Sequence, residues 1–235
     1  MILIDESLYV VHDTLNPKIW TSNNKLLPDV EYKLFDIVKE FKEFIYNDVE
    51  IPIIDAHIVG SNASYNYTEQ SDLDLHVIVN YEDIDVCRED LLQVLFNLEK
   101  KSFNDNYDIK IHGINVELYV EDVRSTTMSN GIYSLFRHEW VKFPDKIDPQ
   151  EVNLEPDLSN IKSKVYGILS DGDLQDVNNI IDDLYIMRKN SLTLNGEFGL
   201  GNLIFKELRN DGVLDQLKDR QKSLMSKNLS LECVK

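Results

Sequence analysis

Gly60, Ser61, Asp72 and Asp74 have the side-chain types and the spacing that a reaction at phosphate groups requires. The glycine–serine pair ends a predicted strand, where backbone N–H groups and a small hydroxyl can receive a phosphate that approaches closely. After ten further residues, the two aspartates begin the next predicted strand. Carboxylates at positions i and i+2 of a strand project from the same face, about 7 Å apart along the chain. The four residues therefore predict a site for phosphate chemistry.

A carboxylate pair of this kind suits Mg²⁺, which prefers one or two carboxylates together with phosphate oxygens and water. Two such ions can support an in-line displacement at phosphorus. Glu117 is the candidate for a third carboxylate, because it lies on the polar face of a later predicted strand, as does Glu121. Three carboxylates on one sheet face repel one another unless a cation lies between them. We therefore expect Asp72, Asp74 and Glu117 to be the metal ligands and the catalytic residues.

Each of these patterns also has a purely structural interpretation. An Asp-x-Asp sequence is common on solvent-facing strands, and a Gly-Ser turn is commoner still. Their order and spacing, together with the low preference of aspartate for strands, favour a functional site. Five other residues could contact a substrate, although packing or surface roles are favoured for them. They are Tyr65, Tyr67, His76, Arg137 and Lys142.

Apolar periods around the motif predict the elements that position it. Strand patterns cover residues 51–59, 72–80, 109–111 and 114–121, with a hairpin turn at His112-Gly113. Helical periods cover residues 28–47 and 85–101. The second of these places four leucines on one face, Leu91, Leu92, Leu95 and Leu98, and a turn at 104–106 follows it. The order predicts an α+β fold, a mixed sheet with helices on one face.

The composition changes beyond residue 144. Prolines at 144, 149 and 156 punctuate an acidic stretch, and helical periods follow near residues 161–169, 177–187 and 203–217. The glycine-rich stretch 196–201 is interpreted as a turn between helices, because no strand precedes it and no Lys-Ser/Thr pair closes it. We expect a catalytic domain over residues 1–150 and an all-helical domain over residues 151–235.

Acidic residues dominate the charge, since 42 Asp and Glu against 24 Lys and Arg give a formal net charge of −18. This charge works against binding extended nucleic acid through its phosphates. No stretch approaches the roughly 20 consecutive apolar residues of a membrane span. The first residues, Met1–Glu6, lack the basic start of a signal peptide. We expect a cytoplasmic protein without a membrane partner.

The run Ile58-Val59-Gly60-Ser61, ten residues and Asp72-Leu73-Asp74, preceded by a helix, resembles the signature of the DNA polymerase β-like nucleotidyltransferase superfamily. The spacing is similar to that of its minimal members, and the resemblance covers about residues 30–125. A wider set of segments resembles predicted nucleotidyltransferases of large tailed bacteriophages. These segments are Leu15–Trp20, Ser71–His76, Val116–Val120 and Gly131–Leu135, followed by Trp140 and Pro144.

The resemblance implies a nucleotidyltransferase-like fold and a role for each residue of the motif. Gly60 and Ser61 would hold the β- and γ-phosphates of ATP or another nucleoside triphosphate. Asp72 and Asp74 would bind two Mg²⁺ ions, and Glu117 would share the metal next to the acceptor hydroxyl. The family often has aspartate at the third position, so this glutamate is a departure. The reaction would transfer a nucleoside monophosphate and release pyrophosphate.

The acceptor and two rival functions stay open. A small alcohol, a protein side chain, an RNA 3′ end or a second nucleotide could accept the nucleotide, and the acidic composition favours a small molecule or a protein. The chain could instead be a catalytically silent nucleotide-binding or structural protein, although all five motif residues are intact. It could also be an acidic interaction protein that imitates nucleic acid, which the motif spacing opposes.

Overall fold

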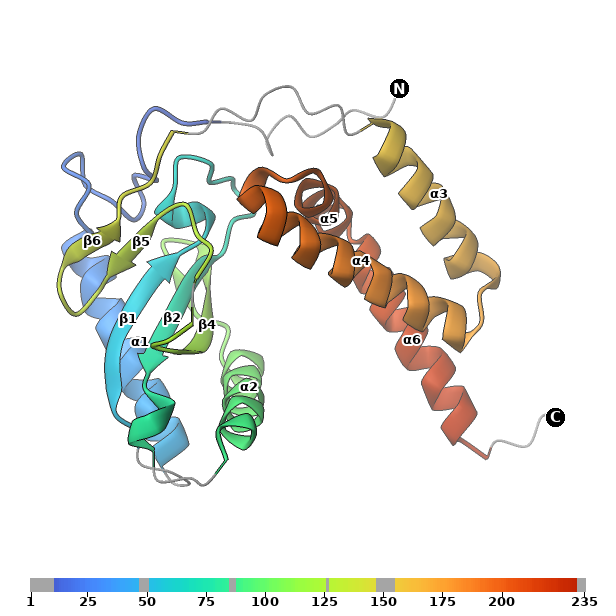
Figure 1. The fold of residues 1–235 in the computed structure, drawn as a ribbon, viewed down its shortest axis with the longest axis horizontal. Coiled ribbons are helices and arrows are strands. Elements are labelled where there is room, and N and C mark those ends of the chain that lie inside the picture. The colour runs from blue at the N-terminus through green and yellow to red at the C-terminus, as the bar shows by residue number, and fades with distance from the viewer. Residues whose placement is uncertain (1–10, 47–50, 85–87, 126, 147–154, 232–235) are drawn as a thin grey trace. The chain divides into compact units, whose positions relative to one another are not determined.

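The computed structural model describes residues 11–46, 51–84, 88–125, 127–146 and 155–231. The chain divides into two compact units, of which one is Tyr9–Asp148 and the other contains Pro149–Lys235 (Figure 1). The boundary expected at residue 150, the helix start expected at residue 85 and the segment Met1–Glu6 lie outside the described residues.

The first unit is built on a six-stranded mixed sheet, which confirms the predicted α+β class. The strands have the order β3-β4-β2-β1-β5-β6. The neighbouring strands β2 and β4 are parallel, and the other pairs are antiparallel. Its elements are α1 (Pro28–Tyr46), β1 (Ile53–Val59), β2 (Leu73–Val79), α2 (Glu89–Asn106), β3 (Lys110–Ile111), β4 (Ile114–Asp122), β5 (Ile132–Ser134) and β6 (Glu139–Lys142).

Helices α1 and α2 pack on one face of this sheet, as predicted, and leave the motif on the other. The alternation of β2 buries Leu73, Leu75 and Val77 in a core that both helices share. Phe41 of α1 meets Phe103 of α2 edge to face, with ring centroids 5.2 Å apart. Each sheet residue between two core residues points to the opposite face, because side chains alternate along a strand. The hydrophobic core therefore sets the direction of the acidic side chains.

Helix α2 differs from its prediction in both face and length. The leucine face was right at Leu92, which is buried, but wrong at Leu91 and Leu98, which are exposed. Phe96 and Phe103 complete the buried face with Leu92. The buried positions follow steps of four and seven residues, the period of an ordinary α-helix face. The turn predicted at residues 104–106 was also wrong, since α2 continues to Asn106.

Strands β5 and β6 extend the sheet beyond the predicted four strands. They contain three and four residues, too few for a strand period to be recognised. Trp140 of β6 packs against Trp20 and Tyr133, at ring-centroid distances of 4.6 and 5.3 Å. These aromatic contacts hold the hairpin to the rest of the unit.

The second unit is helical, with α3 (Glu155–Asp171), α4 (Leu174–Asn195), α5 (Leu200–Asn210) and α6 (Val213–Leu229). The single helix predicted near 203–217 is two helices, because Gly212 adopts a left-handed conformation (φ 70°) between them. Residues 196–199 link α4 to α5, so the turn predicted at 196–201 is present, although its last two residues already belong to α5. A Cβ at Gly201 would lie 2.9 Å from Cγ of Met187, so this glycine allows the two helices close contact. None of the helices described is long and apolar enough to span a bilayer.

The new assignment of the α2 core face predicts unequal effects of two substitutions. Phe96→Ala should lower the free energy of unfolding by about 3–5 kcal/mol, because Phe96 is buried and its loss leaves a cavity. Leu98→Ala should change it by less than about 0.5 kcal/mol, because Leu98 is 61% exposed. Urea denaturation of both variants measures the difference. A larger loss of unfolding free energy for Leu98→Ala than for Phe96→Ala would instead support the leucine face that the sequence predicted.

Candidate active site

Gly60 and Asp74 lie against each other at the adjoining ends of β1 and β2. Val59, the last residue of β1, pairs with Asp74 across the antiparallel ladder. Gly60 then turns with φ 73° and ψ −160°, a conformation that side chains with a Cβ rarely adopt. A Cβ at residue 60 would overlap Oδ2 of Asp74 and lie 3.1 Å from its Cγ. Glycine is therefore required both by the backbone and by the neighbouring carboxylate.

Glu117 is the direct neighbour of Asp74 on the other side. In the parallel pairing of β2 with β4, Asp74 is opposite Glu117, and the core residues Leu75 and Leu118 are opposite each other. Residues paired in this way share a sheet face, and neighbouring strands lie about 4.8 Å apart. The structure thus brings together Gly60, Asp74 and Glu117 in one row, with Asp72 directly before β2.

The row of Gly60, Asp74 and Glu117 offers carboxylate oxygens of the kind that bind Mg²⁺, but it does not supply a complete set of ligands. Its carboxylate oxygens are hard donors, and the space above Gly60 holds a carboxylate where another residue would place a methyl group. These residues fit the predicted metal. Among the residues described, however, no three His, Cys, Asp or Glu side chains are grouped closely enough to hold a metal ion. The backbone register of β2 and β4 places Asp74 and Glu117 side by side, and the three-ligand group of Asp72, Asp74 and Glu117 stays a prediction.

Asn62 connects the motif, a role that the sequence analysis missed. It is fully buried, and its Nδ2 donates to the carbonyl oxygens of Ser71 and Asp72 at 3.2 and 2.9 Å. Its Oδ1 accepts a hydrogen bond from Asn16 Nδ2 at 2.7 Å, and its carbonyl accepts one from Trp20 Nε1 at 2.7 Å. The Leu15–Trp20 segment therefore holds the Ser61–Asp72 loop closed. The polar Asn16 within that segment was the available signal.

In this structure the predicted phosphate-binding turn, Gly60–Ser61, forms hydrogen bonds with other groups of the protein. The Gly60 N–H donates to Ser129 Oγ at 3.1 Å, and Ser61 Oγ donates to Ser71 Oγ at 2.9 Å. Lys142 Nζ donates to the Ser129 carbonyl at 2.8 Å. A phosphate that used the Gly60 amide would take the place of the Ser129 hydroxyl.

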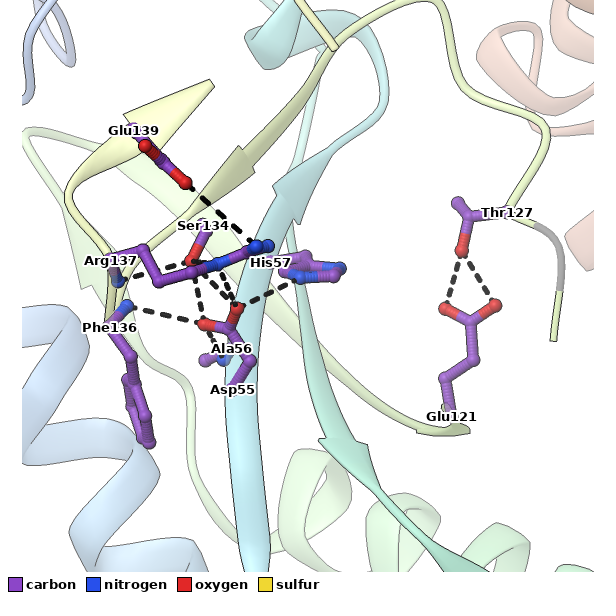
Figure 2. A network of polar contacts seen from close by, with 9 residues as sticks. All are labelled: Asp55, Ala56, His57, Glu121, Thr127, Ser134, Phe136, Arg137 and Glu139. Carbon is purple, nitrogen blue, oxygen red and sulfur yellow. Dashed lines mark hydrogen bonds and ion pairs between the residues drawn. The ribbon is translucent and has the colours of Figure 1, made fainter. Parts of the chain in front are cut away.

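His76 lies one step along the same face and is fixed by an acid. Its Nδ1 is 2.8 Å from Oε2 of Glu121, and Thr127 Oγ1 donates to the same carboxylate at 2.6 Å. Burial alone would raise the pKa of Glu121, but the hydrogen bonds from His76 and Thr127 outweigh it and keep that pKa below its usual value. Figure 2 shows the Glu121–Thr127 contact.

Arg137 belongs to a second polar network on this face, centred on Asp55 (Figure 2). The buried Asp55 carboxylate accepts hydrogen bonds from Ser134 Oγ at 2.7 Å and from the Ala56 N–H at 2.8 Å. His57 Nε2 and Arg137 Nε lie 3.2 and 3.3 Å from its Oδ2. Burial would raise the pKa of Asp55, yet the hydrogen bonds from Ser134 and from the Ala56 and Phe136 N–H groups, together with the nearby His57, keep that pKa below its usual value. Arg137 is thus committed to a structural contact.

The two tyrosines of the Ser61–Asp72 loop also have structural contacts. Tyr67 stacks on His12 with ring centroids 3.9 Å apart, and His12 Nε2 lies 3.0 Å from the Tyr67 carbonyl oxygen. Lys146 Nζ lies 5.1 Å from the centroid of the Tyr65 ring. The packing interpretation therefore accounts for both rings.

The contact between Gly60 and Asp74 predicts that Gly60→Ala destabilises the protein more than Gly113→Ala. Both glycines have positive φ, so both substitutions strain the backbone, and the strain should be larger at Gly60, whose φ of 73° and ψ of −160° belong to a region that is essentially restricted to glycine. Only at residue 60 would the added methyl group also meet another side chain, since nothing lies within 4 Å of a Cβ at residue 113. Urea denaturation should show an additional loss of about 1 kcal/mol or more at residue 60. Equal losses would contradict the close contact.

Comparison with known proteins adds little to this geometry. No protein-family model matches the sequence, and no curated protein matches it. Among solved structures, the chain is similar to a STING-associated CdnE c-di-GMP synthase from Capnocytophaga granulosa. The two share 15% sequence identity over 87% of this chain and 84% of that chain, with a TM-score of 0.23. A likeness this weak carries no argument about function.

Proposed function

We propose that this protein is a Mg²⁺-dependent nucleotidyltransferase, which transfers a nucleoside monophosphate from a nucleoside triphosphate to a hydroxyl acceptor. The observation that supports this most is the row Gly60–Asp74–Glu117, in which two carboxylates share a sheet face beside a glycine that leaves room for one of them. Two like charges in register oppose folding, so their retention favours a ligand that is positively charged.

Each residue of the row has a part in this proposal. Gly60 and Ser61 bind the β- and γ-phosphates at the end of β1 and orient the leaving pyrophosphate. Asp72, Asp74 and Glu117 would hold Mg²⁺, which supplies neutralisation of the charge that develops at phosphorus. Glu117, on the farther from Gly60 of the two strands β2 and β4, lies nearest the acceptor and takes part in removing its proton.

The two units would have different roles in the reaction. Residues 1–150 form the catalytic domain in this proposal, and the helical residues 151–235 select the acceptor. The open sheet face carries Asp55, Asp74, Glu117 and Glu121, so an extended nucleic acid would meet repulsion there. A small molecule or a protein side chain is the acceptor that this charge favours.

Titration calorimetry of the four nucleoside triphosphates tests the proposal. At least one should bind in the presence of Mg²⁺ and lose its binding when the metal is removed with EDTA. Asp72→Ala/Asp74→Ala should weaken that binding about a hundredfold or more, because loss of even the outer partners of metal ligands costs 10–100-fold. The matched control is Asp105→Ala/Asp108→Ala, which removes two exposed carboxylates and should leave binding unchanged.

Three results would contradict the proposal. If the folded wild type binds no triphosphate, the acidic interaction protein becomes the better explanation. If the Asp72/Asp74 variant binds as well as the wild type, the nucleotide site lies elsewhere. Tight Mg²⁺-dependent binding without transfer to any acceptor would instead support a silent nucleotide-binding protein.

A further inference from the structure

Lys100 reaches the acidic face of the sheet from the helix side, along the part of the β4 edge that the short strand β3 does not cover. Asn104 fastens α2 to this edge, since its Nδ2 donates to the Leu118 carbonyl at 3.0 Å and the Leu118 N–H donates to its Oδ1 at 3.2 Å. Lys100 lies one turn earlier on the same side of α2. Its Nζ lies 4.1 Å from the centroid of the Tyr119 ring, on the face that carries Glu117.

Lys100 therefore completes the row of motif residues on the side opposite Gly60. The order across the sheet is Gly60 at the end of β1, Asp74 on β2, Glu117 on β4 and then Lys100 beyond the edge of β4. Burial lowers the pKa of Lys100, and the negative charge of Glu117 partly restores it. The two side chains therefore interact electrostatically. The carboxylate pair thus lies between a glycine–serine turn and an ammonium group.

This ammonium group is half-buried and has no ion-pair partner among the described residues. In the part of the chain that the structure describes, no carboxylate oxygen lies within 4.0 Å of Lys100 Nζ. Charged groups that lose water are usually paired, because an unpaired one is costly. A free anion would be repelled by Asp74 and Glu117, whereas a phosphate bound together with Mg²⁺ would not. The position suits a metal-bound phosphate.

We propose that Lys100 binds the α-phosphate of the nucleotide and positions it over the Asp74–Glu117 pair. The inference rests on the proposed function, in which the β- and γ-phosphates occupy the Gly60–Ser61 side. The phosphate that reaches furthest from that side along the row is the α-phosphate. The Lys100 ammonium group then stabilises the charge on its oxygens as the bond to pyrophosphate breaks.

Calorimetry with two probes separates the α-phosphate from the other two. The probes are Mg²⁺ with an α,β-methylene analogue of the triphosphate that the wild type binds, and Mg²⁺ with pyrophosphate, which lacks the α-phosphate. Lys100→Met should weaken binding of the analogue about tenfold, the effect of one charge-assisted hydrogen bond, and leave pyrophosphate binding unchanged. Lys100→Arg should restore most of the affinity for the analogue.

Two further variants control for charge and position. Lys101→Met removes an exposed lysine next in sequence and should bind both probes like the wild type. Ser61→Ala should weaken both probes, because both carry the phosphates assigned to that turn. Thermal unfolding of Lys100→Met shows whether the variant is folded, and Lys100→Arg provides a second test at the same position.

The outcomes distinguish this inference from the proposed function. If the wild type binds the analogue but Lys100→Met binds it equally well, the inference fails and the proposed function stands. Equal weakening of both probes by Lys100→Met would also overturn it, since Lys100 would then act on the β- and γ-phosphates or through general charge. If the wild type binds neither probe, the proposed function fails together with the inference.

Discussion

The contact between the Asp74 carboxylate and Gly60 is the constraint on which the candidate site depends. The carboxylate occupies space that any other residue at position 60 would fill, so the end of β1 and the start of β2 can approach only with glycine there. Pairing of Val59 with Asp74 then places the Gly60–Ser61 turn beside the carboxylate row. The same approach keeps Asp74 on the face that the core does not use, because its neighbours Leu73 and Leu75 are fully buried.

Buried polar groups around the motif make this arrangement specific. Asn62 joins the loop, the start of β2 and the Leu15–Trp20 segment through four hydrogen bonds. Asp55 does the same for β1 and β5 on the open face through Ser134. Removing the hydrogen-bond partners of a buried amide or carboxylate destabilises the fold. Each of these groups therefore disfavours other arrangements of the strands that it joins. The acidic face is therefore held in shape by its own polar contacts, away from the hydrophobic core.

Much of the fold could be predicted from periodicity, and its failures have physical causes. The pattern of α1 and the alternation of β2 were clear because one face of each is buried in one continuous core. The α2 face was misjudged because apolar residues lie on two sides of that helix, and only packing decides which side is buried. For the site, the faces of β2 and β4 indicated that Asp74 and Glu117 would share a surface, but their exact pairing follows from the parallel register. The contacts of Asn62 and Lys100 could not be identified from these residues themselves, because they join separate segments of the chain, and the polar Asn16 was the available signal for those of Asn62.

The parallel pairing of β2 with β4 also determines when the carboxylate row can form during folding. Parallel neighbours need a crossover connection, and here α2 is that connection, so Asp74 and Glu117 meet only after the whole intervening segment has folded back on the sheet. Such non-local pairing forms slowly, since chain entropy is lost before the contact is gained. A chain still emerging from the ribosome presents Asp74 without Glu117, and the carboxylate row is complete only once β4 has been synthesised.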